Sequence, residues 1–138
     1  MTEPPHKRDV AGVMAKLLHH TDEKRGMTMT PFASRCVRAG ELHELVTSDH
    51  DGFAPGSQVD RVGFLGFVEI RSGGVIDVGD LLTIAGRPVG KVIGFDDCHF
   101  PNHYNVLVGV PELRTAGLLS LAVEDEVVFR STAESVRT

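Results

Sequence analysis

Glycine and proline interrupt this sequence so regularly that few apolar runs are long enough to form an extended helix. The chain has 15 glycines and 7 prolines among 138 residues, with short runs of Val, Ile, Leu and Phe between them. Brief apolar segments bounded by turn residues are typical of strands joined by tight turns. A chain of this length forms one domain with a single core. We therefore expect a single all-β domain over residues 1–138, with flexible ends at 1–8 and 131–138.

The middle of the chain predicts a series of strands separated by glycine turns. The expected strands span 62–70, 75–78, 81–85, 89–95 and 104–110. Gly63 and Gly66 interrupt the first of them, which is typical of a bent or bulged strand at a barrel corner. Residues 117–129 repeat the layout of 74–84. Two copies of one strand-turn-strand pattern favour a small closed or nearly closed β-barrel with at most short helices, because closure removes exposed sheet edges.

The N-terminal third leaves alternatives open. In residues 10–18 the apolar side chains recur at both helical and strand spacing. Gly12 weakens a helix, and the polar residues 21–26 would serve as the tip of a hairpin. We therefore favour a β-hairpin that returns through 27–37. Residues 41–46 fit either one or two turns of helix or another strand.

Residues 66–95 combine a glycine turn, an apolar-Gly-Asp-apolar run, a short hairpin and a returning Val-Ile-Gly. This segment resembles the barrel of translation-factor second domains and, more faintly, the glucitol/sorbitol-specific enzyme IIA component of the sugar phosphotransferase system. The whole chain also looks like an uncharacterised family of small bacterial proteins. These resemblances imply a β-barrel. No phosphoryl-accepting histidine is carried over from the transport component, because the region around His43 does not align with it.

Composition and charge argue against several classes of partner. The chain has 14 Lys and Arg against 19 Asp and Glu, so its net charge of −5 lacks the basic excess that binds nucleic-acid phosphates. No apolar stretch approaches the roughly 18 residues of a membrane span, and residues 1–8 precede no apolar signal core. We expect a cytoplasmic protein that forms a homodimer. Cys36, expected in the core, and Cys98 are predicted to be free thiols.

The most polar segment, residues 96–105, lies between two expected strands. It contains two His, two Asp, a Cys, two Asn and the single Tyr of the chain. Such side chains donate, accept and exchange protons near neutral pH, and loops commonly carry sites. We expect the apolar Phe100 and Pro101 to fold this loop inward. The predicted catalytic groups here are His99, His103 and Asp97, and the predicted substrate-binding groups are Asn102, Asn105 and Tyr104.

A second polar cluster, residues 34–44, combines cations, acids and an imidazole. If the segment is extended, Glu41 and His43 point to one face, where the carboxylate can hold the imidazole in one tautomer. Both are predicted catalytic groups. Arg35 and Arg38 are predicted to bind a substrate carboxylate or phosphate, because a guanidinium matches two oxygens at once.

One divalent metal ion is the cofactor that these residues could hold. The predicted ligands are His43, His99, His103 and Glu44, because two or three imidazoles with one carboxylate form a common metal-binding set. The spacing is not that of a His-Glu-x-x-His motif, since Thr47 stands where the second His would be. The metal-free alternative uses a histidine as general acid or base opposite a carboxylate.

These features predict a small-molecule enzyme with acid/base chemistry, either metal-assisted or metal-free. Isomerisation, elimination or cyclisation of a polar or carboxylate-bearing substrate suits histidines that carry protons. The alternative is a non-catalytic ligand-binding, carrier or adaptor module in which the 96–105 loop recognises a ligand or partner. In either case we expect the two polar clusters to meet at the mouth of the barrel.

Overall fold

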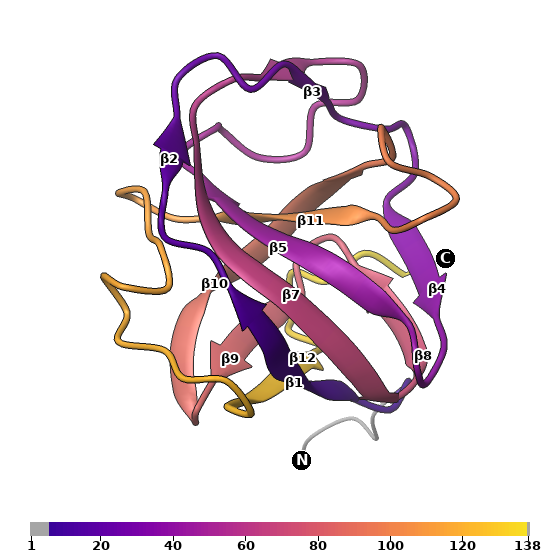
Figure 1. Cartoon of the computed structure of the whole chain (residues 1–138). Helices are drawn as coiled ribbons and strands as arrows, with labels where there is room; N and C mark the ends of the chain where they lie inside the picture. Colours follow the sequence, from indigo (N-terminus) through magenta and orange to yellow (C-terminus); the bar gives the residue numbers. More distant parts are fainter. Residues whose placement is uncertain (1–5, 138) are drawn as a thin grey trace.

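The computed structural model describes residues 6–137, and this range contains strands and turns but no helix (Figure 1). It accordingly has no helix that is long and apolar enough to cross a membrane. The strands in chain order are β1 (Val10–Leu17), β2 (Thr21–Asp22), β3 (Met27–Thr28), β4 (Ser34–Val37), β5 (Leu42–Ser48), β6 (Gln58–Val59), β7 (Val62–Ser72), β8 (Gly74–Asp77), β9 (Leu81–Ile84), β10 (Arg87–Asp96), β11 (Asn105–Gly109) and β12 (Glu126–Arg130). The predicted all-β class is confirmed.

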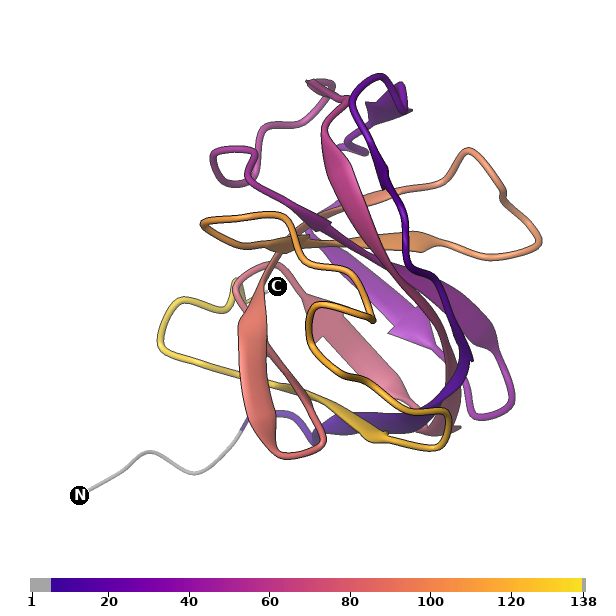
Figure 2. The same cartoon turned by 60° about the vertical axis from the view of Figure 1, so that its left-hand side comes forward.

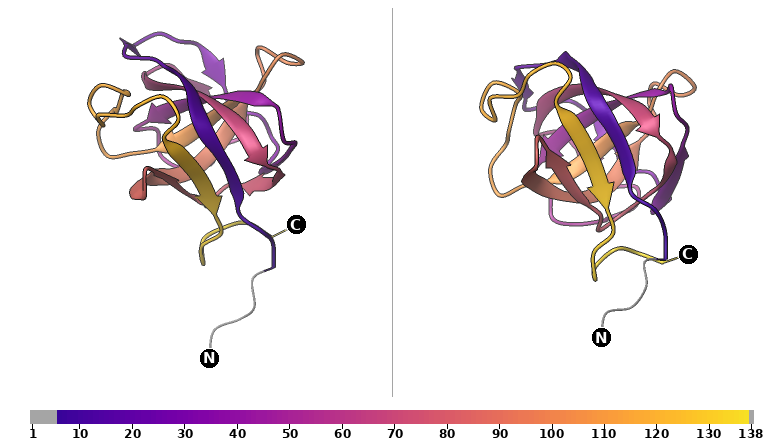
Figure 3. Two further views of the ribbon diagram at one scale, coloured as in Figure 1. Left: turned by 60° about the horizontal axis from the view of Figure 1, so that its bottom comes forward. Right: turned by 90° about the horizontal axis from the view of Figure 1, so that it is seen from below.

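Seven strands form a ring in the order β1, β12, β9, β10, β11, β5 and β7, which closes because β7 pairs with β1. The pairing of β11 with β5 is parallel, and the other pairings around the ring are antiparallel. β2 extends the sheet beside β7, whereas β3 pairs with β6 and β4 with β8 in two small sheets. In Figure 3, β1 and β12 lie side by side across the near side of the ring. The nearly closed barrel is confirmed, although its outline is uneven.

The longest strand, β7, bends at Gly66. This residue has a φ of 133°, and the pairings of β7 with β1 and with β5 both shift in register beside it. A Cβ at this position would clash with the carbonyl oxygen of Lys16, so only glycine fits. The predicted bent strand is confirmed, and the bend carries β7 along both β5 and β1.

Apolar side chains are buried on both sides of part of the barrel wall. The larger cluster, which includes Phe95, Phe129 and Leu45, fills the ring. A second cluster, which includes Met27 and Val46, lies between the wall and the small β3–β6 sheet. Because successive side chains of a strand point to opposite faces, Leu45 of β5 enters the ring and Val46 leaves it. The wall formed by β5 is therefore covered on both faces.

The C-terminal residues 131–137 pack against the turn between β8 and β9, where we expected a flexible end. Ser135 is buried, and its hydroxyl donates a hydrogen bond of 2.6 Å to Asp80. The backbone N–H of Val136 donates to the carbonyl of Val78 at 2.9 Å. A buried carboxylate needs donors, so the tail completes the environment of Asp80.

A buried ionic network ties the N-terminal segment to the same turn. Lys7 Nζ donates to the Asp77 carboxylate at 2.8 Å and also to Asp80. Asp77 is 4% exposed and Asp80 is 0% exposed, and Ser34 donates to Asp77 from β4. Lys7 therefore supplies the positive charge for two buried carboxylates. Of the expected flexible N-terminus, residues 1–5 lie outside the described residues.

Strand pairing settles one open alternative and corrects two predictions. Residues 27–37 do not return along β1, because β3 pairs with β6 and β4 pairs with β8, so the predicted hairpin is wrong. Residues 41–46 lie in β5, where pairing with β7 and β11 satisfies the backbone on both edges. Residues 117–123 form turns, so the second strand-turn-strand copy has only its last strand, β12.

Candidate functional site

A row of five side chains crosses the outer face of the barrel wall, one each from β10, β11, β5, β7 and β1. These residues are partners on neighbouring strands: Asp96, Asn105, Glu44, Phe67 and Lys16. A chain neighbour of each belongs to the core inside the ring or packs against it, so the alternation of side chains places the row outside. Asp96, Asn105 and Glu44 are nevertheless buried. The row therefore forms a polar floor under the covering loop.

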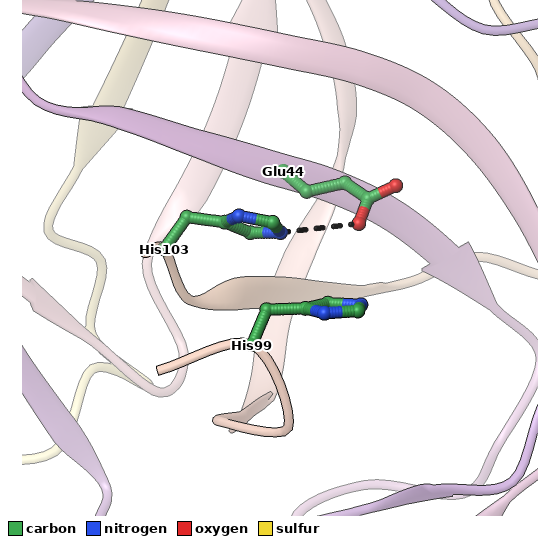
Figure 4. A group of neighbouring side chains, drawn as sticks. All are labelled: Glu44, His99 and His103. Carbon is green, nitrogen blue, oxygen red and sulfur yellow. Dashed lines mark ion pairs between the residues drawn. The ribbon is translucent and has the colours of Figure 1, made fainter. Parts of the chain in front are cut away.

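The loop between β10 and β11, residues 97–104, brings two histidines to Glu44. This loop is the orange lobe at the right of Figure 1, and it projects from the body of the protein in Figure 2. His103 Nε2 lies 3.6 Å from Glu44 Oε1, and the rings of His99 and His103 stack with centroids 4.9 Å apart (Figure 4). Ligand atoms of the three residues all lie within 4.8 Å of one another. Glu44, His99 and His103 thus form a candidate metal-binding group.

His103 is the most enclosed histidine of this group. Its side chain is 8% exposed, and the Phe67 ring packs edge-on against it at 5.2 Å. Burial lowers the pKa of His103; the Glu44 carboxylate opposes this shift and His99 adds to it. The Asn102 amide lies 3.0 Å from Nδ1, whereas Nε2 is buried and has no hydrogen-bond partner among the described residues. The imidazole is therefore neutral at neutral pH, with one nitrogen facing Glu44.

Asp96 holds the base of the loop. Its carboxylate accepts hydrogen bonds from the backbone N–H groups of Thr28 (2.9 Å) and Cys98 (3.0 Å) and from Asn105 Nδ2 (2.9 Å). Burial would raise the pKa of Asp96, but the Cys98 thiol together with these hydrogen bonds outweighs it and lowers the pKa. With Nδ2 engaged, Asn105 Oδ1 has no hydrogen-bond partner within residues 6–137, and Asn105 is the strand partner of Glu44. Asn105 therefore links the base of the loop to the strand that carries Glu44.

We predict that Asp96→Asn destabilises the protein at neutral pH by about 1–3 kcal/mol, because an amide cannot accept all three hydrogen bonds. The lowered pKa of Asp96 means that its contribution is complete above the unfolded-state value of about 3.9 and is lost as the pH falls through the lower folded-state value. The difference in unfolding free energy between the wild type and this variant should therefore stay constant from pH 7 to about pH 4 and shrink from there toward pH 3. Urea unfolding across this range measures it.

Asp97→Asn is the matched control, because Asp97 is exposed and its contact with Arg35 spans 3.9 Å. This substitution should change the unfolding free energy by less than about 0.5 kcal/mol. Equal destabilisation by the two substitutions, or a deficit of Asp96→Asn that does not depend on pH, would contradict the role of the Asp96 carboxylate.

His43 belongs to a separate pair. The backbone N–H of Tyr104 donates to His43 Nδ1 at 3.0 Å, so the ring proton is on Nε2, which lies 3.1 Å from Glu41 Oε1. The expected contact of Glu41 with His43 is present. Both nitrogens of His43 are engaged, and the structure places His43 outside the group that could hold a metal ion, although the sequence predicted it as a ligand. The backbone N–H of Arg38 lowers the pKa of Glu41, burial opposes this shift, and His43 adds to the lowering.

The predicted anion-binding residues have other contacts. The Arg35 guanidinium lies between the rings of Phe32 and Tyr104, 4.7 Å and 4.5 Å from their centroids. The backbone N–H of Arg38 donates to Glu41 Oε1 at 2.9 Å. Neither arginine lines the cleft described below. Asp97 lies 3.9 Å from Arg35 and is not part of the histidine group, and its catalytic role stays a prediction.

A cleft of about 640 Å³ opens between the 97–104 loop and the start of β5. Residues 100–104 and 40–43 line it, together with Ala15, Lys16, Cys36 and Phe67. The two polar clusters therefore meet, as expected, but they do so over the start of β5 and the outer wall, because apolar side chains fill the ring itself. The sequence did not indicate that Lys16 and Phe67 line this cleft, because both lie in mainly apolar strands and belong to no recognisable motif.

Three further expectations need correction. Phe100 is 61% exposed, so it does not fold the loop inward. Cys36 is exposed at the cleft and is not a core residue. Burial raises the pKa of Cys98, and the neighbouring Asp96 raises it further, so this residue is a neutral thiol at neutral pH.

Comparison with known proteins identifies a family and no characterised relative. No curated protein and no solved structure matches the chain. The resemblances to the sugar-transport component and to translation-factor barrels therefore stay predictions. One family model, described as a family of unknown function, matches residues 4–130, so the chain belongs to DUF6917.

Proposed function

We propose that this protein is a small-molecule enzyme in which Glu44, His99 and His103 bind one divalent transition-metal ion and the adjacent cleft binds the substrate. The observation that carries the proposal is the convergence of these three donors from β5 and a distant loop, with ligand atoms within 4.8 Å of one another. Two imidazoles and one carboxylate suit zinc and the other divalent first-row metals, and they leave coordination positions open for a substrate.

The contacts of the three residues fit such an ion. His103 Nε2 is buried and lacks a hydrogen-bond partner among residues 6–137, and an unpaired buried nitrogen is costly unless something binds it. When Nδ1 carries the proton, a half-turn of the Asn102 amide lets its oxygen accept that proton, and Nε2 then offers its lone pair. Arg25 Nη2 lies 3.1 Å from His99 Nε2, so His99 would give up this contact if it held a metal ion through the same nitrogen.

The bound ion would act as a Lewis acid toward a substrate oxygen. The chain itself supplies the acid/base groups. His43 presents its Nε2 proton to Glu41 at the wall of the cleft, and the Tyr104 backbone holds this tautomer. The lowered pKa of Glu41 keeps it ionised at neutral pH, so this carboxylate can accept a proton, although the lowering makes it a weaker base; His43 steadies the carboxylate through its Nε2 proton. Isomerisation, elimination and cyclisation each require side chains that transfer protons in this way.

Elemental analysis of the untagged protein, purified without chelator, tests the metal. We expect about one zinc, iron, manganese, cobalt or nickel ion per chain. Protein stripped with a chelator should regain one equivalent on titration with zinc chloride, and its unfolding temperature should rise, because ligands that bind only the folded state stabilise it. Protein that contains no metal and takes up none during titration would refute the metal site and leave the metal-free reaction at His43 and Glu41.

A non-catalytic ligand-binding or carrier module is the second candidate. Phe32 and Phe100 are 55% and 61% exposed near the cleft, and exposed aromatic side chains suit contact with another protein. A ligand that binds the cleft without turnover would favour this function. The homodimer and the cytoplasmic location stay predictions; light scattering during gel filtration tests the first.

A further inference from the structure

Lys16 holds a distinctive position in the cleft. It lies on β1, is exposed, and is the one lysine or arginine among the cleft residues. Within residues 6–137 its ammonium group makes no ion pair, whereas Lys7 and Lys91 are both paired with carboxylates. A positive charge that lacks a protein partner at a concave surface is available to an anionic ligand.

Phe67 is the one residue of the row that lies between Lys16 and Glu44, so the floor is apolar at this point. Lys16 and Glu44 flank Phe67 on neighbouring strands, so their backbones are about 10 Å apart, which is two strand spacings. Phe100, Pro101 and Tyr104 face the same cleft from the loop. A ligand that reaches from Lys16 toward His103 therefore crosses Phe67 and has rings and a proline beside it. Aromatic surfaces of this kind favour a flat apolar body.

The charges of the cleft's own side chains favour a single negative charge on the ligand at the Lys16 end. Glu41 lines the cleft and Glu44 lies beside His103, whereas Lys16 is the one lysine or arginine that lines it; the proposed metal ion would lie on the far side of Phe67. A phosphate group carries nearly two charges and is usually bound by several cations or by a row of backbone N–H groups. A carboxylate carries one charge, so a single lysine can neutralise it. The site thus matches a carboxylate better than a phosphate.

We infer that the cleft binds a monoanionic carboxylate with a flat apolar body, with the carboxylate at Lys16 and the body over Phe67. This inference rests on the proposed function, because it names the substrate class of the same cleft. Lys16 takes the part that the sequence assigned to Arg35 and Arg38. Lys16 selects ligands that carry a carboxylate. The opposite end of the substrate, which carries the reacting polar group, lies toward His103.

A binding experiment with two matched probes tests this inference. Benzoate and benzamide have nearly the same shape and differ in charge. Their affinities for chelator-stripped protein, measured by amide NMR titrations, therefore report the contact of the carboxylate with Lys16, because no bound zinc competes for the carboxylate oxygens. We expect benzoate to bind more tightly than benzamide by about tenfold, with the largest shifts at Lys16, Phe67 and Tyr104. Lys16→Gln should abolish this preference and Lys16→Glu should reverse it.

Lys24→Gln is the matched control, because Lys24 is an exposed lysine that does not line the cleft. It should keep the full preference for benzoate. Equal binding of the two probes to the wild type, an unchanged preference in Lys16→Glu, or no benzoate binding would overturn the inference. If Lys16-dependent benzoate binding persists in protein that takes up no metal, the ligand class stands and the metal part of the proposed function falls.

Discussion

Replacing His103 with alanine should lower the bound metal from about one ion per chain to background. The substitution removes one of three ligands, and only Glu44 and His99 remain. We expect an affinity loss greater than the roughly 10- to 100-fold that accompanies loss of an outer hydrogen-bond partner of a metal ligand. Zinc titration of stripped protein, followed by elemental analysis after gel filtration, measures it.

Three further variants show whether the effect is local. Glu44→Gln keeps the shape of the side chain and removes its charge, so it should also lose the metal. His19→Ala removes an exposed histidine outside the group and should bind metal like the wild type. His43→Gln should likewise keep the metal, although it should lower activity once a substrate is known. Full metal binding by His103→Ala with a native circular dichroism spectrum would show that the three residues do not form the site.

Lys7→Met should destabilise the protein by about 3–5 kcal/mol, because it leaves two buried carboxylates without their cation. Asp80 is 0% exposed and Asp77 is 4% exposed, so water cannot readily replace Lys7. For a domain of this size we expect the unfolding temperature to fall by roughly 10–20 °C at pH 7. Thermal unfolding followed by circular dichroism tests this expectation.

The matched control is Lys24→Met, which removes an exposed lysine and should leave the unfolding temperature within about 2 °C of the wild type. Combining Lys7→Met with Asp80→Asn should restore part of the loss, because one buried negative charge then disappears. If Lys7→Met unfolds at the wild-type temperature, Lys7 does not neutralise the network.

The sequence by itself determined the class of fold and the segments that carry polar chemistry. Turn residues recur at short intervals, and apolar runs of strand length between them can form a core only as a sheet. The interruption at Gly66 predicts the bend of β7 because a side chain does not fit there. The polar clusters 34–44 and 96–105 stand out because they gather groups that donate, accept and exchange protons, and loops commonly carry sites.

Residues 10–37 could not be assigned from their pattern, because helical and strand spacing coincide in 10–18. The partners of β3 and β4 are β6 and β8, which lie far along the chain. Pairings of this kind depend on long-range closure of the ring and on burial. Local spacing carries no information about them.

Only the tertiary structure decided which predicted groups act together. Alternation along β5 puts His43 and Glu44 on opposite faces, yet it does not say which face meets the loop. The parallel pairing of β11 with β5 sets Asn105 beside Glu44, and β7 sets Phe67 between Glu44 and Lys16. These neighbours come from strands separated by long stretches of sequence. The candidate metal group and its cleft therefore exist because the ring closes, which no local pattern of residues specifies.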